Sequence, residues 1–280
     1  MLNAKDKIGI VCCSNGQKLE KKSEINKLNE ALNALEITTV FSPYIYEQES
    51  VFGATANERA KALMDLFINK DIKIIFDISG GDIANGILPF LDYEAIKDSK
   101  AIFAGYSDLT TVINAIYTKT GKSSILYQLR NIIYDNSEIQ IKNIMSLDDS
   151  IFKFEYSFCR GNEMSGILVG GNIRCFLKLA GTEYMPDLNG KILLLESYGG
   201  KVAQIETFFC QLQQLGAFDS VAGIILGTFT QMEEEKFKPT VIELLNRFIP
   251  KDLPVATTNM IGHGTDSRAA IIGKKIVLSK

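Results

Sequence analysis

Three residues in this sequence have the types needed for the nucleophile, the base and the orienting acid of a hydrolase. Ser107 follows the apolar run AIFAGY and precedes a helix-like segment. Glu196 ends the run KILLLE, and His263 is the single histidine of the chain. Serine becomes a useful nucleophile when an imidazole removes its proton, and a carboxylate commonly orients that imidazole. The sequence predicts acyl-transfer chemistry if folding brings these three residues together.

Each of the three residues also has a purely structural interpretation. Ser107 could cap the following helix, because serine is a preferred N-cap residue. Glu196 could face solvent at the end of its strand, and His263 could be a loop histidine without a role. A catalytic serine gains from a sharp strand-to-helix turn, but the hydrolase elbow GxSxG is incomplete, because Leu109 occupies the position of the second glycine.

A glycine pair, Gly80-Gly81, is a fourth candidate feature. It follows the run DIKIIFDIS and precedes Asp82. Backbone amides exposed at such a turn can stabilise an oxyanion. The alternative is a plain tight turn, because glycine tolerates positive φ values.

These candidates require a fold that gathers the ends of strands. The apolar runs that we expect to be strands in the first half cover residues 7–14, 37–43, 71–81 and 101–105. Helix-like segments alternate with them, which is typical of a parallel sheet with helices on both faces. In such sheets ligands lie beyond the carboxyl ends of the strands, where the serine and the glycine pair are expected.

The pattern changes after a polar stretch near the middle of the chain, NSEIQIKNIMSLDDS. Beyond it, GILVGGN, KILLLES, VAGIILGTF and KKIVLS read as strands, with one clear helix in VAQIETFFCQLQQL. We predict an α/β fold in two parts: an N-terminal parallel-sheet α/β domain at 1–135 and a strand-rich C-terminal α+β domain at 166–280. Residues 136–165 are the predicted linker region.

The composition excludes several classes of protein. With 46% apolar and 22% charged residues among 280, the chain is an ordinary globular protein. Its formal charge is −3, and no Lys/Arg-rich block is interleaved with aromatic residues, so a nucleic-acid partner is not expected. No apolar run approaches the roughly 20 residues of a membrane helix, and no signal-peptide core follows Met1. We expect a cytoplasmic protein with a small-molecule or peptide ligand and no membrane partner.

The cysteines do not form a metal or redox motif. They make no CxxC pair and no Cys/His cluster, which argues against a structural zinc site or a redox dithiol. Their odd number also fits poorly with a disulfide framework. The five are Cys12, Cys13, Cys159, Cys175 and Cys210.

Motifs along nearly the whole chain resemble the LD-carboxypeptidase family of serine peptidases, which also contains the microcin C self-immunity hydrolases. The resemblance is carried, in order, by IGIVCCS, FGATANERA, ISGGDIANGILPFLDYEAI, AIFAGYSDLT, GILVGGNIRCFLKLAGTEYMPDLNGKILLLES, VAGIILGTF and IGHGTDSRAAIIG. The GYSD turn, the LVGGN segment and the late GHG are specific in that order.

The resemblance implies a role for each candidate residue. Ser107 is the expected nucleophile, His263 the general base and acid, and Glu196 the group that orients the imidazole. The family's oxyanion hole of backbone amides falls on Asp108 and on the glycine turn, where we favour Gly81. The resemblance also implies a homodimer that needs no metal or cofactor and acts on a small peptide or peptide conjugate.

Several positions depart from the family pattern and leave the substrate open. Cys12-Cys13 replaces the usual Ala-Pro of the first turn, and Ser197 stands where an aspartate often follows the glutamate. The glycine turn reads Ser-Gly-Gly-Asp, closer to the self-immunity branch than to the Arg-Gly-Gly-Tyr-Gly of muropeptide-cleaving members. Members of the self-immunity branch stack a tryptophan on the nucleotide base, whereas this chain has no tryptophan.

We therefore predict a serine carboxypeptidase that cleaves muropeptides near a carboxyl terminus. An amidase of aminoacyl- or peptidyl-nucleotide conjugates is the alternative enzyme. A catalytically inactive small-molecule binder on the same scaffold is the alternative from another class. The sequence does not distinguish the exact conjugate, its stereochemistry or its pathway.

Overall fold

The computed structural model describes all 280 residues, and the N-terminal half forms a parallel sheet extended by one strand from the far end of the chain. Its strands are β1 (Lys7–Val11), β2 (Thr38–Phe41), β3 (Ile72–Asp77), β4 (Ile102–Gly105), β5 (Ser124–Leu126) and β11 (Ala270–Ile272). Their order is β11-β5-β4-β3-β1-β2, and only β11 runs antiparallel to its neighbour. The parallel α/β arrangement predicted for this half is confirmed.

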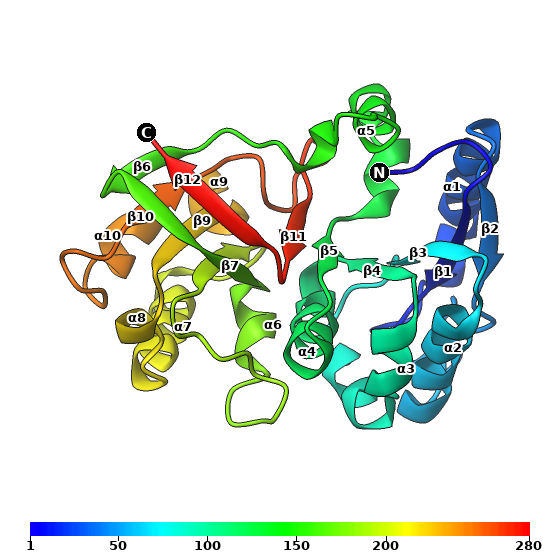
Figure 1. The fold of residues 1–280 in the computed structure, drawn as a ribbon, viewed down its shortest axis with the longest axis horizontal. Coiled ribbons are helices and arrows are strands. Elements are labelled where there is room, and N and C mark those ends of the chain that lie inside the picture. The colour runs from blue at the N-terminus through cyan, green and yellow to red at the C-terminus, as the bar shows by residue number, and fades with distance from the viewer.

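Helices follow the strands of this first sheet (Figure 1). They are α1 (Lys22–Ala34), α2 (Ala56–Ile68), α3 (Tyr93–Asp98), α4 (Thr110–Thr120) and α5 (Ser137–Ile144). Short 3₁₀ segments complete the connections: η1 (Leu19–Lys21), η2 (Ala84–Phe90), η3 (Ser107–Leu109), η4 (Leu129–Ile133) and η5 (Ser150–Phe152). Local chemistry sets their limits: α2 starts at a capping box in which Thr55 and Glu58 bond each other's backbone amides.

The second half forms another six-stranded sheet, with antiparallel strands at both edges. Its strands are β6 (Ser157–Arg160), β7 (Glu163–Asn172), β8 (Ile192–Ser197), β9 (Gly223–Phe229), β10 (Val255–Thr257) and β12 (Lys275–Ser279). The order is β12-β7-β8-β9-β10-β6, with β7 to β10 parallel. Its helices are α6 (Ile173–Leu177), α7 (Val202–Gln214), α8 (Ala217–Ser220), α9 (Thr230–Glu234) and α10 (Val241–Leu245). The prediction of a second, strand-rich part is confirmed, whereas the exact domain limits stay a prediction.

Strand β11 links the two halves. It comes from the C-terminal end of the chain but pairs with β5 of the first sheet, which the sequence pattern did not predict. A three-residue apolar strand carries no signal of which sheet edge it will join. The segment from β10 to β11 must therefore cross from the second sheet to the first, and it carries His263.

One of three hydrophobic clusters spans both sheets. A cluster of buried side chains runs from Val112 on α4 to Leu194 on β8 and Ala270 on β11. Figure 1 shows α4 and α6 between the two sheets, and these helices contact each other. Packing in this cluster fixes the positions of the carboxyl ends of β4 and β8 relative to each other.

No helix of the structure combines the length and apolar character that crossing a membrane requires.

Candidate active site

Ser107 lies on a sharp turn directly after β4. Its φ of +55° is in the left-handed region, which costs a residue with a side chain roughly 1–2 kcal/mol. The turn also needs Gly105, because a Cβ there would lie 2.7 Å from the Cβ of Leu109. The Ser107 side chain caps neither η3 nor α4 and makes no hydrogen bond within the chain. The N-cap interpretation of this serine is therefore wrong, and the backbone strain presents its hydroxyl at the strand end.

The carboxylate of Asp108 fixes this turn to three other segments. The side chain is fully buried and accepts hydrogen bonds from Ser14 Oγ at 2.6 Å, the Ala84 amide at 2.9 Å and Lys178 Nζ at 2.6 Å. Sequence reasoning had considered Asp108 only for its backbone amide. A buried carboxylate needs such partners, and they come from elements that are distant in the chain.

Glu196 is the penultimate residue of β8 and is fully buried, so the solvent-facing interpretation is wrong. Its Oε2 lies 2.8 Å from Nδ1 of His263, while its Oε1 has no hydrogen-bond partner. With the carboxylate ionised, this geometry makes Nδ1 the donor and leaves Nε2 free to accept a proton.

Two tyrosines flank the His263 ring. The ring centroids of Tyr106 and Tyr198 lie 4.9 Å and 5.0 Å from that of the imidazole. Burial raises the pKa of Tyr106 well above its usual value, and the nearby Glu196 carboxylate adds to the rise, so this hydroxyl stays neutral. The aromatic contacts and Glu196 together restrict the imidazole to one orientation.

Glycines allow the His263 loop to approach the second sheet closely. A Cβ on Gly262 would lie 1.7 Å from Oγ1 of Thr228, and one on Gly227 would lie 2.3 Å from the carbonyl oxygen of Ile261. Ser267 Oγ then donates to the Gly262 carbonyl at 2.7 Å. This close packing brings His263 onto the end of β8.

The glycine turn lies beside Ser107 and is held by Asn15. Gly81 has φ +124°, and a Cβ there would lie 2.2 Å from the Asn15 side chain, whereas nothing lies within 4 Å of the same position on Gly80. The Asp82 amide donates to Asn15 Oδ1 at 3.2 Å. Sequence reasoning did not select Asn15, although it follows β1 at the same carboxyl edge of the sheet.

Two cavities meet at Ser107 and His263, which line both. The smaller, about 220 Å³, also contains Ser79, Gly80 and Arg130, and we call it the Arg130 cavity. The larger, about 490 Å³, also contains Gly81, Asn172 and Arg174, and we call it the Arg174 cavity. A substrate that occupies both cavities would lie against the serine hydroxyl and the imidazole.

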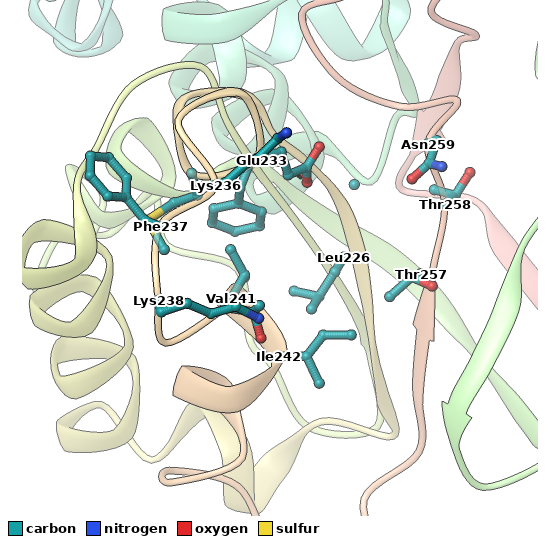
Figure 2. Close-up of a pocket in the computed structure, with 14 residues that line it drawn as sticks. Leu226, Glu233, Lys236, Phe237, Lys238, Val241, Ile242, Thr257, Thr258 and Asn259 are labelled. Carbon is teal, nitrogen blue, oxygen red and sulfur yellow. Dashed lines mark hydrogen bonds between the residues drawn. The ribbon is translucent and has the colours of Figure 1, made fainter.

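A larger cavity, about 640 Å³, lies elsewhere, at the carboxyl ends of β9 and β10. Figure 2 shows Leu226, Val241 and Ile242 on one part of its wall and Glu233 and Lys236 on another. It contains neither Ser107 nor His263, so size alone does not identify the reactive site. The candidate site is marked instead by the imidazole of His263, which contacts the buried Glu196 carboxylate and lines the same cavities as Ser107.

The cysteines take no visible part in this site. Burial raises the pKa values of Cys12 and Cys13 well above the usual range, and burial followed by the charge of Asp108 raises that of Cys175 to about 12. These thiols are therefore protonated near neutrality. The side chains of the structure form no group of three or more His, Cys, Asp or Glu residues that could hold a metal ion.

Comparison with known proteins is consistent with this geometry. Residues 8–127 match the sequence model of the LD-carboxypeptidase N-terminal domain, and residues 165–278 match that of the LD-carboxypeptidase C-terminal domain. The chain belongs to the LD-carboxypeptidase family. It is therefore a hydrolase of the carboxypeptidase class, and the predicted family is confirmed.

Individual relatives fall in both branches of the family. The microcin C7 self-immunity protein MccF of Escherichia coli is 31% identical over 72% of this chain and 69% of its own. The probable murein peptide carboxypeptidase of Bacillus subtilis is 25% identical over 99% of this chain and 90% of its own. A solved structure of MccF in complex with aspartyl sulfamoyl adenosine superposes with a TM-score of 0.88, at 25% identity, covering 99% of this chain and 94% of that one.

Proposed function

We propose that this protein is a serine peptidase or amidase with Ser107 as nucleophile, His263 as general base and acid, and Glu196 as the residue that orients the imidazole. The observation that carries the proposal is the 2.8 Å contact between His263 Nδ1 and the buried Glu196 carboxylate. It leaves Nε2 as the ring nitrogen available to Ser107, which lines the same two cavities. Direct contact between the hydroxyl and Nε2 often forms only when substrate is bound.

The reaction would proceed through an acyl-enzyme. Ser107 Oγ attacks the amide carbonyl carbon while Nε2 of His263 takes the hydroxyl proton. The backbone amides of Gly81 and Asp108 hold the resulting oxyanion, a type of contact that contributes about 2.7–4 kcal/mol per donor in a well-studied protease. The imidazolium then protonates the leaving amine, and water hydrolyses the acyl-enzyme by the same route in reverse.

Peptide substrates that end in a free carboxyl group are our first candidates, as in the murein peptides named for the B. subtilis relative. Conjugates of an amino acid or peptide with a nucleotide are the second, supported by the MccF relative and by the aspartyl sulfamoyl adenosine in the superposed MccF structure. The absence of tryptophan argues against the second, because no indole can stack on a base.

Two experiments test the proposal. A fluorophosphonate reagent should label Ser107 in the wild type and leave the Ser107→Ala variant unlabelled, as read by peptide mass spectrometry. Absence of labelling together with absence of turnover would favour a non-catalytic binder. Separate incubations with a murein tetrapeptide and with aspartyl sulfamoyl adenosine, followed by mass spectrometry of the products, distinguish the two substrate classes.

We further propose that the enzyme acts in the cytoplasm as a homodimer on small peptides, without nucleic-acid partners. Light scattering after size-exclusion chromatography tests the dimer: a mass near the 31.0 kDa of one chain would contradict it.

A further inference from the structure

The Arg130 cavity contains a cation whose hydrogen bonds are few and long. Arg130, on η4, is half-buried, and its Nε and Nη1 contact Gln128 at 3.4 Å, Gln17 at 3.4 Å and Glu24 at 3.5 Å. Its Nη2 makes no hydrogen bond within the chain. Because guanidinium carries two N–H donors on each Nη atom, both donors of Nη2 are available to a ligand.

The counter-ion of Arg130 is itself shared. Glu24 accepts a 2.5 Å hydrogen bond from Tyr134 Oη through the same oxygen that faces Arg130. Burial raises the pKa of Tyr134 to about 12, with a further contribution from Glu24, so this hydroxyl remains a donor near neutrality. The Glu24 oxygen that faces Arg130 is therefore already hydrogen-bonded to Tyr134, and its contact with the guanidinium is long.

The cations of the neighbouring Arg174 cavity are more closely paired. Arg174 bonds both the carboxylate of Asp82 and the carbonyl of Gly81. Lys178, which does not line this cavity but contacts the same Asp82, lies 2.6 Å from Asp108 and 3.4 Å from Asp82. Of the two cavities, the Arg130 cavity is the one with an incompletely paired cation.

The lining of the Arg130 cavity suits a small anionic group. No carboxylate lines it, and Arg130 is the only arginine or lysine on its walls. Its volume of about 220 Å³ is below the roughly 300 Å³ at which cavities for drug-sized ligands begin. It has room for one small amino-acid residue, whereas a nucleoside would extend beyond it.

We propose that Arg130 binds the terminal carboxylate of the amino acid that leaves when the amide bond is cleaved. This inference rests on the proposed function, because it assigns the leaving residue to the Arg130 cavity and the acyl part to the Arg174 cavity. Planar guanidinium and carboxylate groups form paired, charge-assisted hydrogen bonds, so Arg130 would select a free carboxyl terminus. The sulfonyl oxygens of an acyl sulfamoyl nucleoside could use the same donors, but the rest of that leaving group would lie outside the cavity.

The test compares a murein tetrapeptide with its C-terminal carboxamide. Wild-type kcat/KM should favour the free acid by about 10- to 100-fold, the range expected of a charge-assisted hydrogen bond. Arg130→Gln should abolish most of that preference by lowering kcat/KM for the acid and leaving the amide within about threefold. Arg130→Lys keeps the charge but loses the planar guanidinium, which can form two parallel hydrogen bonds to a carboxylate. This variant should therefore retain part of the preference for the free acid.

Arg160→Gln is the matched control. Arg160, on β6 of the second sheet, is also half-buried but bonds the Pro250 carbonyl and the Asn246 side chain and lines neither cavity. The Arg160→Gln variant should keep the wild-type preference for the free acid. An equal fall in kcat/KM for the acid and the amide in Arg130→Gln would overturn the proposal, because a purely structural role of Arg130 predicts that result. If Arg130→Gln does not fold, an Arg130→Lys variant with the full wild-type preference would overturn it as well.

Binding separates this inference from the proposed function. In the Ser107→Ala background, isothermal titration should show the acid binding more tightly than the amide, and adding Arg130→Gln should remove the difference. A Ser107→Ala enzyme that still hydrolyses the peptide would contradict the proposed nucleophile without affecting that comparison. Equal affinities for acid and amide would contradict the role of Arg130. Loss of aspartyl sulfamoyl adenosine hydrolysis in Arg130→Gln, with the acid preference intact, would also overturn the carboxylate assignment.

Discussion

The carboxyl ends of β4 and β8 present their functional groups in different ways. At β4 the backbone positions the serine: Ser107 has φ +55°, and its hydroxyl has no partner. At β8 a buried carboxyl group positions the proposed base: Glu196 is fully buried, and its bond to His263 joins two segments that are distant in the chain. A substitution at the first end should therefore change chemistry alone, whereas one at the second should change chemistry and electrostatics together.

The largest expected effect belongs to the β4 end. Ser107→Ala should lower kcat by a factor on the order of 10³ or more, because no other hydroxyl replaces the nucleophile. The free energy of unfolding should change by less than about 1 kcal/mol, because the hydroxyl caps no helix. Steady-state hydrolysis and thermal unfolding measure the two effects, and turnover within tenfold of wild type would remove Ser107 from the nucleophile role.

His263→Ala tests the proposed base at the β8 end and should lower kcat nearly as much as Ser107→Ala does. His263 is the only histidine, and only a neutral imidazole accepts the serine proton, so wild-type kcat/KM should fall with a single protonation as the pH decreases. The variant should lose both the rate and this acid limb. A still active His263→Ala enzyme with an unchanged pH profile would show that another group is the base.

Glu196→Gln should lower kcat by less than Ser107→Ala does, since Glu196 orients the imidazole without reacting. In a well-studied protease, loss of the orienting carboxylate lowers kcat by about 3 × 10⁴, against about 2 × 10⁶ for loss of the serine. Because Oε1 of Glu196 is buried without a hydrogen-bond partner, the neutral and nearly isosteric glutamine should leave the melting temperature equal or higher. Wild-type activity in this variant would contradict the orienting role. A large drop in melting temperature would contradict the electrostatic account of the β8 end.

Gly81→Ala tests whether backbone geometry also governs the glycine turn beside β4. A side chain at φ +124° is strained and would collide with Asn15, so the variant should lose about 1–3 kcal/mol of unfolding free energy. Gly80→Ala is the matched control for stability, because a Cβ there meets nothing within 4 Å. Chemical denaturation compares them, and equal stabilities would show that the conformation of Gly81 is not required.

The smallest effect is expected of the thiols. With a pKa of about 12, Cys175 has a thiolate fraction on the order of 10⁻⁴ at pH 8 and should resist iodoacetamide in the folded protein. Cys159 is exposed and should be alkylated first. Activity should survive that alkylation, as followed by mass spectrometry and hydrolysis. Inactivation in step with the modification of Cys175 would implicate a cysteine in the site.

Much of the fold was predictable because its signals are local. Buried parallel strands appear as continuous apolar runs. The alternation of such runs with helices predicts the first sheet without any information on strand pairing. The strand-end position of Glu196 and the turn at Ser107 followed from the same runs. Strand β11 was missed, because its pairing with β5 depends on a sheet edge built by residues from the other half of the chain.

The sequence by itself therefore determined which candidate residues are present. They are a serine after one apolar run, a glutamate at the end of another and a single histidine between glycines, together with the family motifs that contain them. The tertiary structure decided which groups meet. It buried Glu196 against His263, paired the Asp108 carboxylate with Lys178, and left Arg130 incompletely paired in a cavity beside Ser107. Hydrogen bonds and charge compensation depend on distances of a few ångströms between residues remote in the chain, and only packing of the two sheets around a common core sets those distances.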